Sequence, residues 1–87
     1  MFKSEVVLTN KSGFHARPAS VFLKEALEYK SDIKVGKNKI EYNGKSIIGI
    51  LSMGAVKGDL ITIIAEGEDE KEAVESLKRL VQNGFGE

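Results

Sequence analysis

The sequence has no cysteine, no tryptophan, one proline and one histidine among its 87 residues. The absence of cysteine excludes disulfides, thiolate metal sites and cysteine nucleophiles. Neither sign of charge is in excess, because 13 lysines and arginines balance 13 aspartates and glutamates. Binding to nucleic acid therefore has no support, since it usually needs a surplus of positive charge. No apolar run approaches the roughly 18 residues of a membrane span, so we expect no membrane insertion.

The remaining composition is that of a small folded domain. Hydrophobic residues make up 41% of the chain and charged residues 30%, which favours a folded domain over disorder. A chain of 87 residues is long enough for one small domain, which we expect to span residues 1–87. Near the start of the chain, Glu5 stands where a signal peptide would need an apolar run. We therefore expect a soluble, cytoplasmic protein.

Two hydrophobic periodicities divide the chain into elements. A two-residue period predicts strands at about 2–9, 33–35, 40–42 and 60–65, the last apolar enough to be central in a sheet. A helical period predicts helices at about 16–29, from 46 to near 54, and between 69 and 83. The order β-α-β-β-α-β-α predicts an α+β open-faced β-sandwich. In it, three helices cover one face of a four-stranded antiparallel sheet.

The most informative stretch is segment 13–19, with the sequence GFHARPA. Imidazole is the side chain that changes charge near physiological pH, and proline is tolerated in the first turn of a helix. We therefore expect His15 at a helix N-terminus, where free amides and the helix dipole favour anions. Arg17 adds a planar cation that suits phosphate. These groups predict a site for a phosphoryl group.

Proline at position 18 has two further consequences. Because Pro18 has no N–H, the amides of Ala16 and Arg17 remain as first-turn donors for an anion. Proline also disfavours helical geometry in the residue before it. We therefore expect Arg17 to stay outside regular helical geometry, and mobile, until an anion fixes it.

Less specific explanations of His15 also exist. A lone histidine is often a surface residue that caps a helix. A serine nucleophile would need His15 as its base together with a remote acid, and no signature indicates either. A metal site is a poor fit, because one histidine and scattered carboxylates make a weak ligand set.

Segment 13–19 closely resembles the active-site motif of the HPr family. These proteins are the histidine-containing phosphocarriers of the bacterial phosphoenolpyruvate-dependent sugar phosphotransferase system. A second segment, KSIIGILSMG at 45–54, is similar to the family's regulatory serine region. The chain length and the order of elements match as well. Phe14 departs from the leucine that the family more often has, which is a conservative apolar change.

The resemblance implies a role for each residue of the motif. His15 would accept a phosphoryl group on Nδ1 from phospho-enzyme I and pass it to the EIIA domain of a sugar transporter. Ala16, Arg17 and Pro18 would form the phosphate-binding set, and Arg17 would also pair with acidic groups on the partners. The protein would be a stoichiometric carrier rather than an enzyme, and we expect a monomer without a cofactor or metal.

Ser46 has two interpretations. At the start of a short helix it is a good N-cap, and the resemblance makes it the family's regulatory phosphorylation site. An HPr kinase/phosphorylase and a catabolite-control repressor would then be possible partners. Four apolar residues follow that cannot all face inward on so short a helix. We expect some of them to form an exposed patch that docks partners; the candidates are Ile47, Ile48, Leu51 and Met53.

Two other functions stay open at this point. One is a regulatory protein that acts mainly through phosphorylated Ser46 in carbon catabolite control. Such relatives resemble HPr but lack the histidine, so His15 argues against this function. The other is an unrelated α+β binding module in which the histidine is fortuitous.

Overall fold

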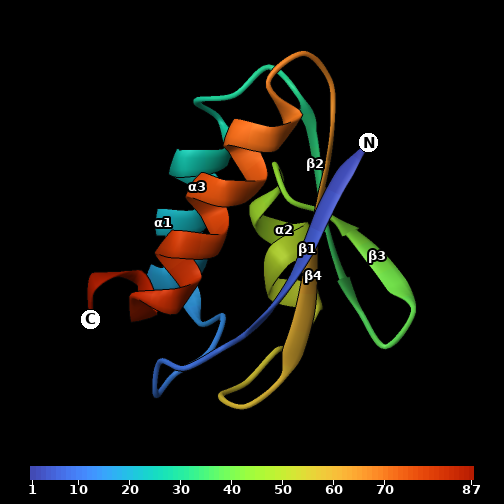
Figure 1. Cartoon of the computed structure of the whole chain (residues 1–87). Coiled ribbons are helices and arrows are strands. Elements are labelled where there is room, and N and C mark those ends of the chain that lie inside the picture. The colour runs from blue at the N-terminus through green and yellow to red at the C-terminus, as the bar shows by residue number, and fades with distance from the viewer.

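A computed structural model describes all 87 residues and places the helices on one face of a four-stranded sheet (Figure 1). The predicted fold and the order β-α-β-β-α-β-α are confirmed, and a short 3₁₀ helix, η1, follows at the C-terminal end. The elements are β1 (Phe2–Val7), α1 (Ala16–Ala26), β2 (Asp32–Lys37), β3 (Ile40–Asn43), α2 (Ile47–Ser52), β4 (Leu60–Glu66), α3 (Glu70–Gln82) and η1 (Gly84–Gly86).

The sheet is antiparallel throughout and has the strand order β1-β4-β2-β3. Strand β4 is central, as its apolar sequence predicts, and Ala65 on it pairs with both Phe2 and Ile33. Side chains alternate along β4, so Ile61, Ile63 and Ala65 face the helices. The other residues of β4 face the side without helices.

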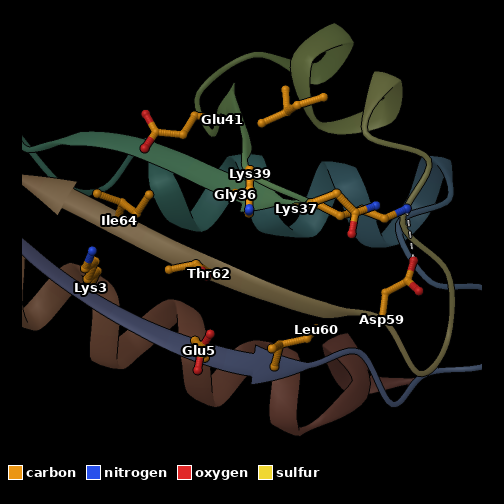
Figure 2. A pocket seen from close by; sticks show the side chains of 12 residues that line it. Lys3, Glu5, Gly36, Lys37, Lys39, Glu41, Asp59, Leu60, Thr62 and Ile64 are labelled. Atoms are coloured by element: carbon orange, nitrogen blue, oxygen red, sulfur yellow. Dashed lines mark ion pairs between the residues drawn. The ribbon is translucent and has the colours of Figure 1, made fainter.

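The face without helices carries a shallow hollow over Gly36 (Figure 2). Gly36 has no side chain, and its neighbours across the sheet are Thr62 and Glu41. At one end of this hollow, an ion pair joins Lys37 at the end of β2 to Asp59 just before β4 (Figure 2). The sheet therefore has charged side chains on one side and the core on the other.

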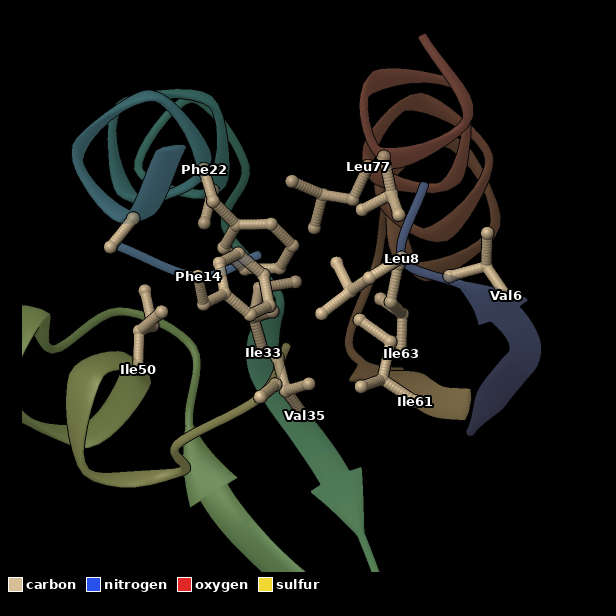
Figure 3. Packing of buried hydrophobic residues seen from close by; sticks show 14 of the residues in the cluster. Val6, Leu8, Phe14, Phe22, Ile33, Val35, Ile50, Ile61, Ile63 and Leu77 are labelled. Carbon is tan, nitrogen blue, oxygen red and sulfur yellow. The ribbon is translucent and has the colours of Figure 1, made fainter. Parts of the chain in front are cut away.

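The core lies between the sheet and the helices, where Phe22, Leu77 and Ile63 meet (Figure 3). Helices α1 and α3 each bury one apolar stripe, as their helical spacing predicts. Helix α1 is shorter than predicted, since it ends at Ala26 and leaves Leu27 exposed. After α1, the chain forms a turn that leads into β2.

That turn is held by the side chain of Asp69, which lies just before α3. One oxygen of Asp69 accepts a hydrogen bond from the amide of Lys30 at 2.9 Å. The other accepts from the amide and hydroxyl of Ser31 at 3.0 and 2.5 Å. These bonds to the charged carboxylate, led by the Ser31 hydroxyl, lower the pKa of Asp69 to about 2. Asp69 thus ties the segment just before β2 to the start of α3.

The loop before α1 passes close to the turn formed by residues 54–59. Gly13 has φ +60°, and the amide of Phe14 donates a hydrogen bond to the carbonyl oxygen of Ala55 at 3.0 Å. A Cβ atom on Gly13 would lie 2.5 Å from that same oxygen and 2.6 Å from Cα of Val56. Only glycine combines this backbone conformation with so close an approach.

We predict that the contribution of Asp69 to stability is lost in acid. Because its folded-state pKa is lowered, the contribution is present above the ordinary value of 3.8 and disappears as pH falls through about 2. Asp69→Asn should therefore unfold more easily than the wild type near pH 7, and the difference should shrink in this acid range. Urea unfolding at several pH values measures this difference in the free energy of unfolding. Glu68→Gln, a change at the exposed neighbouring residue, is the control. A constant difference at every pH would contradict the prediction.

We predict that Gly13→Ala destabilises the fold more than Gly54→Ala does. Both glycines have a left-handed φ, but only at Gly13 would the new methyl group meet backbone atoms. Gly54→Ala should cost about 1 kcal/mol for strain alone, and Gly13→Ala should cost ~2–4 kcal/mol. Urea unfolding measures the free energy of unfolding of both variants. Equal losses would contradict the prediction, because they would show that the backbone of residues 55 and 56 adds no penalty at Gly13.

Candidate functional site

His15 is the N-cap residue of α1, and its side chain is exposed. Its backbone is extended, with φ −81° and ψ −178°, and its carbonyl oxygen accepts the first helical bond from Ala19 at 2.9 Å. The imidazole makes no capping hydrogen bond to the helix. The backbone of His15 therefore accepts the first hydrogen bond of α1, while its ring makes no bond to the helix and can contact a partner.

The first turn of α1 offers two unpaired amides. Ala16 and Arg17 occupy the first two helical positions, so their N–H groups have no helical acceptor. Pro18 follows at the third position without an N–H, and its ring is buried. The first turn contains no acidic residue, so nothing there competes with an external anion. The two predicted free amides are therefore present at the start of α1.

The prediction for the geometry of Arg17 is wrong. The structure places Arg17 inside α1, at its second helical position. The preference imposed by Pro18 is local, and it is outweighed here by the Ala19–His15 hydrogen bond and by burial of the proline ring. Arg17 is exposed, and none of the three ion pairs in the structure includes it. Its guanidinium group is therefore available to an anion beside His15.

Phe14 and Asn10 fix the loop before His15. Phe14 is buried, with its ring centroid 5.3 Å from that of Phe22 and 5.3 Å from that of Phe85. Asn10 is also buried, and its Nδ2 donates a hydrogen bond to the carbonyl oxygen of Gly13 at 2.9 Å. The sequence analysis did not single out Asn10. An asparagine shortly before a glycine was the one local signal for this role.

Ser46 is the N-cap of α2, as predicted. Its backbone is extended, and its Oγ accepts a hydrogen bond from the amide of Gly49 at 3.1 Å. The capping interpretation is therefore confirmed. The side chain is half-buried at the start of a six-residue helix.

The predicted docking patch is only partly exposed. Ile48 and Leu51 face solvent, with exposed fractions of 76% and 41%. Met53 is only 5% exposed and belongs to the core, so its assignment to a docking surface is wrong. Ile47 is half-buried and packs against the core, as does the fully buried Ile50. Residues 47, 50 and 53 are three apart and share one side of the helix, so residues 48 and 51 face away from the core.

Val56 adds an exposed apolar side chain that the sequence analysis did not single out. It follows Ala55, which binds the amide of Phe14, so it lies at the base of the loop that carries His15. Its place depends on the contact between two segments about 40 residues apart in the sequence. A local pattern could not have revealed it.

Two further findings bear on the kind of site. No group of three histidine, cysteine, aspartate or glutamate side chains comes together to hold a metal ion. None of the helices has both the length and the apolar character needed to span a bilayer.

Comparisons with known proteins cover nearly the whole chain. Residues 2–83 match the family model described as "PTS HPr component phosphorylation site". The phosphocarrier protein HPr of Buchnera aphidicola is 43% identical over 81 residues, covering 93% of this chain and 95% of that protein. The HPr-like protein Crh of Bacillus subtilis is 42% identical over 82 residues, with 94% and 96% covered.

A solved structure shares the whole architecture. The crystal structure of an HPr from Thermoanaerobacter tengcongensis matches with a TM-score of 0.97 and 41% identity, covering 100% of this chain and 98% of that one. The family model spans nearly the entire chain, and both sequence and structure agree with it. The chain therefore belongs to the HPr family of phosphocarrier proteins of the phosphotransferase system.

Proposed function

We propose that the protein accepts a phosphoryl group on His15 from phospho-enzyme I and passes it to EIIA domains during sugar uptake. One observation carries the proposal: an exposed imidazole at the N-cap of α1, beside two unpaired amides and an unpaired arginine. We expect the protein to act in the cytoplasm as a monomer, without a cofactor. Membership of the HPr family supports the carrier role.

The transfer needs little covalent chemistry from the protein. A nitrogen of His15, Nδ1 by the family resemblance, forms a bond to phosphorus as the bond between phosphorus and its donor breaks. The reverse exchange then delivers the group to the acceptor. The amides of Ala16 and Arg17 and the guanidinium of Arg17 stabilise the negative charge on the phosphoryl oxygens. The protein is regenerated with each transfer, so it is a stoichiometric carrier and not an enzyme.

The exposed surface around this site gives partners a place to dock. Ile48 and Leu51 on α2 are exposed, and Val56 lies at the base of the His15 loop. Helix α2 packs against α1, the helix that begins with Ala16 and Arg17. We propose that acidic groups on the partners meet Arg17 while their apolar side chains cover Ile48 and Leu51.

Labelled phosphoenolpyruvate together with enzyme I tests the carrier function. The wild type should take up acid-labile label, and His15→Ala should take up none, because it has no nitrogen to accept the phosphoryl group. Arg17→Ala should keep the acceptor but lose charge stabilisation, which should slow uptake about tenfold to a hundredfold. Rapid-quench measurements give the rates. A wild type without label, or a labelled His15→Ala, would refute the assignment.

We also propose that phosphorylation of Ser46 regulates access to His15. A phosphate would add about −1.5 to −2 charges at the start of α2, where the helix dipole tolerates negative charge. It would stand two residues from the exposed Ile48. Its effect would therefore fall on partners, repelling acidic ones and attracting basic ones. An HPr kinase/phosphorylase would be the source of the phosphate, and a catabolite-control repressor a candidate partner.

The test for Ser46 uses ATP and HPr kinase/phosphorylase. Label should enter the wild type and Ser52→Ala, an exposed serine on the same helix, but not Ser46→Ala. Ser46→Asp should slow phosphoryl transfer from enzyme I, because it places a negative charge beside the docking surface. Label retained by Ser46→Ala would refute the site.

Unfolding measurements should show that Ser46→Ala also lowers the free energy of unfolding by roughly 0.5–2 kcal/mol, since it removes the N-cap of α2.

A regulatory protein acting mainly through phosphorylated Ser46 is the alternative, and the HPr-like protein Crh, at 42% identity, is among the relatives. The two assays separate the functions. Label on Ser46 without any transfer through His15 would support the regulatory protein. Transfer through His15 to an EIIA domain would support the carrier.

A further inference from the structure

The segment that carries His15 is supported by the turn formed by residues 54–59. The amide of Phe14 donates to the carbonyl oxygen of Ala55 at 3.0 Å, and Gly13 lies directly against Ala55 and Val56. Phe14 immediately precedes His15, whose backbone begins α1. The position of Ala55 therefore determines where the chain enters the N-cap.

One ion pair holds this turn in place. Oδ2 of Asp59 accepts a hydrogen bond from the amide of Val56 at 2.9 Å and pairs with Nζ of Lys37 at 3.1 Å. The same lysine nitrogen donates to the carbonyl oxygen of Gly54 at 3.3 Å. Figure 2 shows the ion pair between the end of β2 and the turn that precedes β4. Lys37 thus joins the turn to the sheet.

The ion pair is better shielded than the other side-chain ion pair of the sheet. The side chains of Lys37 and Asp59 are 19% and 29% exposed, whereas those of Lys34 and Glu41 are 58% and 55% exposed at 3.8 Å. The Val56 amide, followed by Lys37, lowers the pKa of Asp59, so its charge persists well below neutral pH. Shielded pairs with shared hydrogen bonds hold geometry better than exposed ones.

We infer that Lys37 and Asp59 are positioning residues for phosphoryl transfer: they set the place of His15 through residues 55 and 56 and the loop before α1. This inference rests on the proposed carrier function. Neither residue touches the imidazole. They act because transfer depends on the alignment of the attacking nitrogen, and a displacement of about 1 Å can cost up to a hundredfold in rate. Losing the pair releases the turn that supports Phe14.

The test uses the full chain with three single variants of the pair, the double variant Asp59→Asn/Lys37→Met, and two controls. Asp59→Asn keeps an oxygen for the Val56 amide but removes the charge, and Lys37→Met removes the cation. Lys37→Arg keeps the charge and should restore much of the rate. Lys34→Met and Glu41→Gln remove the exposed pair on the same sheet and serve as matched controls.

Two measurements separate positioning from a general loss of structure. Single-turnover transfer from phospho-enzyme I gives the rate at saturation and the apparent KM. Nitrogen NMR of the His15 ring and of the Ala16 amide reports their surroundings without any partner. Urea unfolding checks that each variant is folded under the assay conditions.

For Asp59→Asn and Lys37→Met, we expect a saturating rate about threefold to tenfold lower and an apparent KM within about twofold of the wild type. The His15 and Ala16 signals should shift in both variants, and the double variant should be no slower than the slower single one. The two control variants should match the wild type in all measurements. These results would support the inference even if one of the pair variants failed to fold.

Other outcomes would overturn it. Unchanged saturating rates with unmoved His15 signals would show that the pair does not position the histidine. A change in KM alone would assign the pair to partner docking through Val56. If the wild type accepts no phosphoryl group, the proposed carrier function fails, and the ring signals then decide the positioning by themselves. Shifted signals would support it, and unmoved signals would reject it.

Discussion

The hydrogen bond from the amide of Phe14 to the carbonyl oxygen of Ala55 is the contact on which the site depends. It joins two loops about 40 residues apart and fixes the chain just before it turns into α1. Gly13 allows the approach, because any side chain there would meet the backbone of residues 55 and 56. Burial of Phe14 between Phe22 and Phe85 anchors the same point to the core. The side chain of His15 is therefore exposed while the backbone before it is held in place by the core and by residues 55 and 56.

The chemistry of the site comes mainly from backbone groups and one cation. The protein has no net charge, and the start of α1 has no acidic residue of its own. In the proposed function, two free amides and Arg17 provide positive potential where the phosphoryl group would lie. Such a local field suits a carrier, because the phosphoryl group must be held firmly enough to be aligned and loosely enough to leave. A strongly basic surface would also attract unrelated anions.

Local patterns predicted much of this protein, because local rules govern much of it. Helical and strand periodicity predicted the fold, and proline chemistry predicted the two free amides beside His15. A second effect of proline, its influence on the residue before it, gave the wrong geometry for Arg17. Burial of Pro18 and a helical hydrogen bond outweigh that preference. The assignment of Met53 failed because six residues are too few to reveal which side of a helix faces the core. The roles of Asn10, Lys37 and Asp59 arise from contacts made only after folding.

The alternation on α2 has a consequence for how such proteins diverge. Residues 47, 50 and 53 hold the helix to the core, whereas Ile48 and Leu51 face outward. Replacing an outward residue changes stability by only about 0.5 kcal/mol, so mutations there accumulate without unfolding the protein. The outward face of α2 can therefore change in sequence while packing against the core constrains the inward face. Surface chemistry and folding are thus separable within a single helix of six residues.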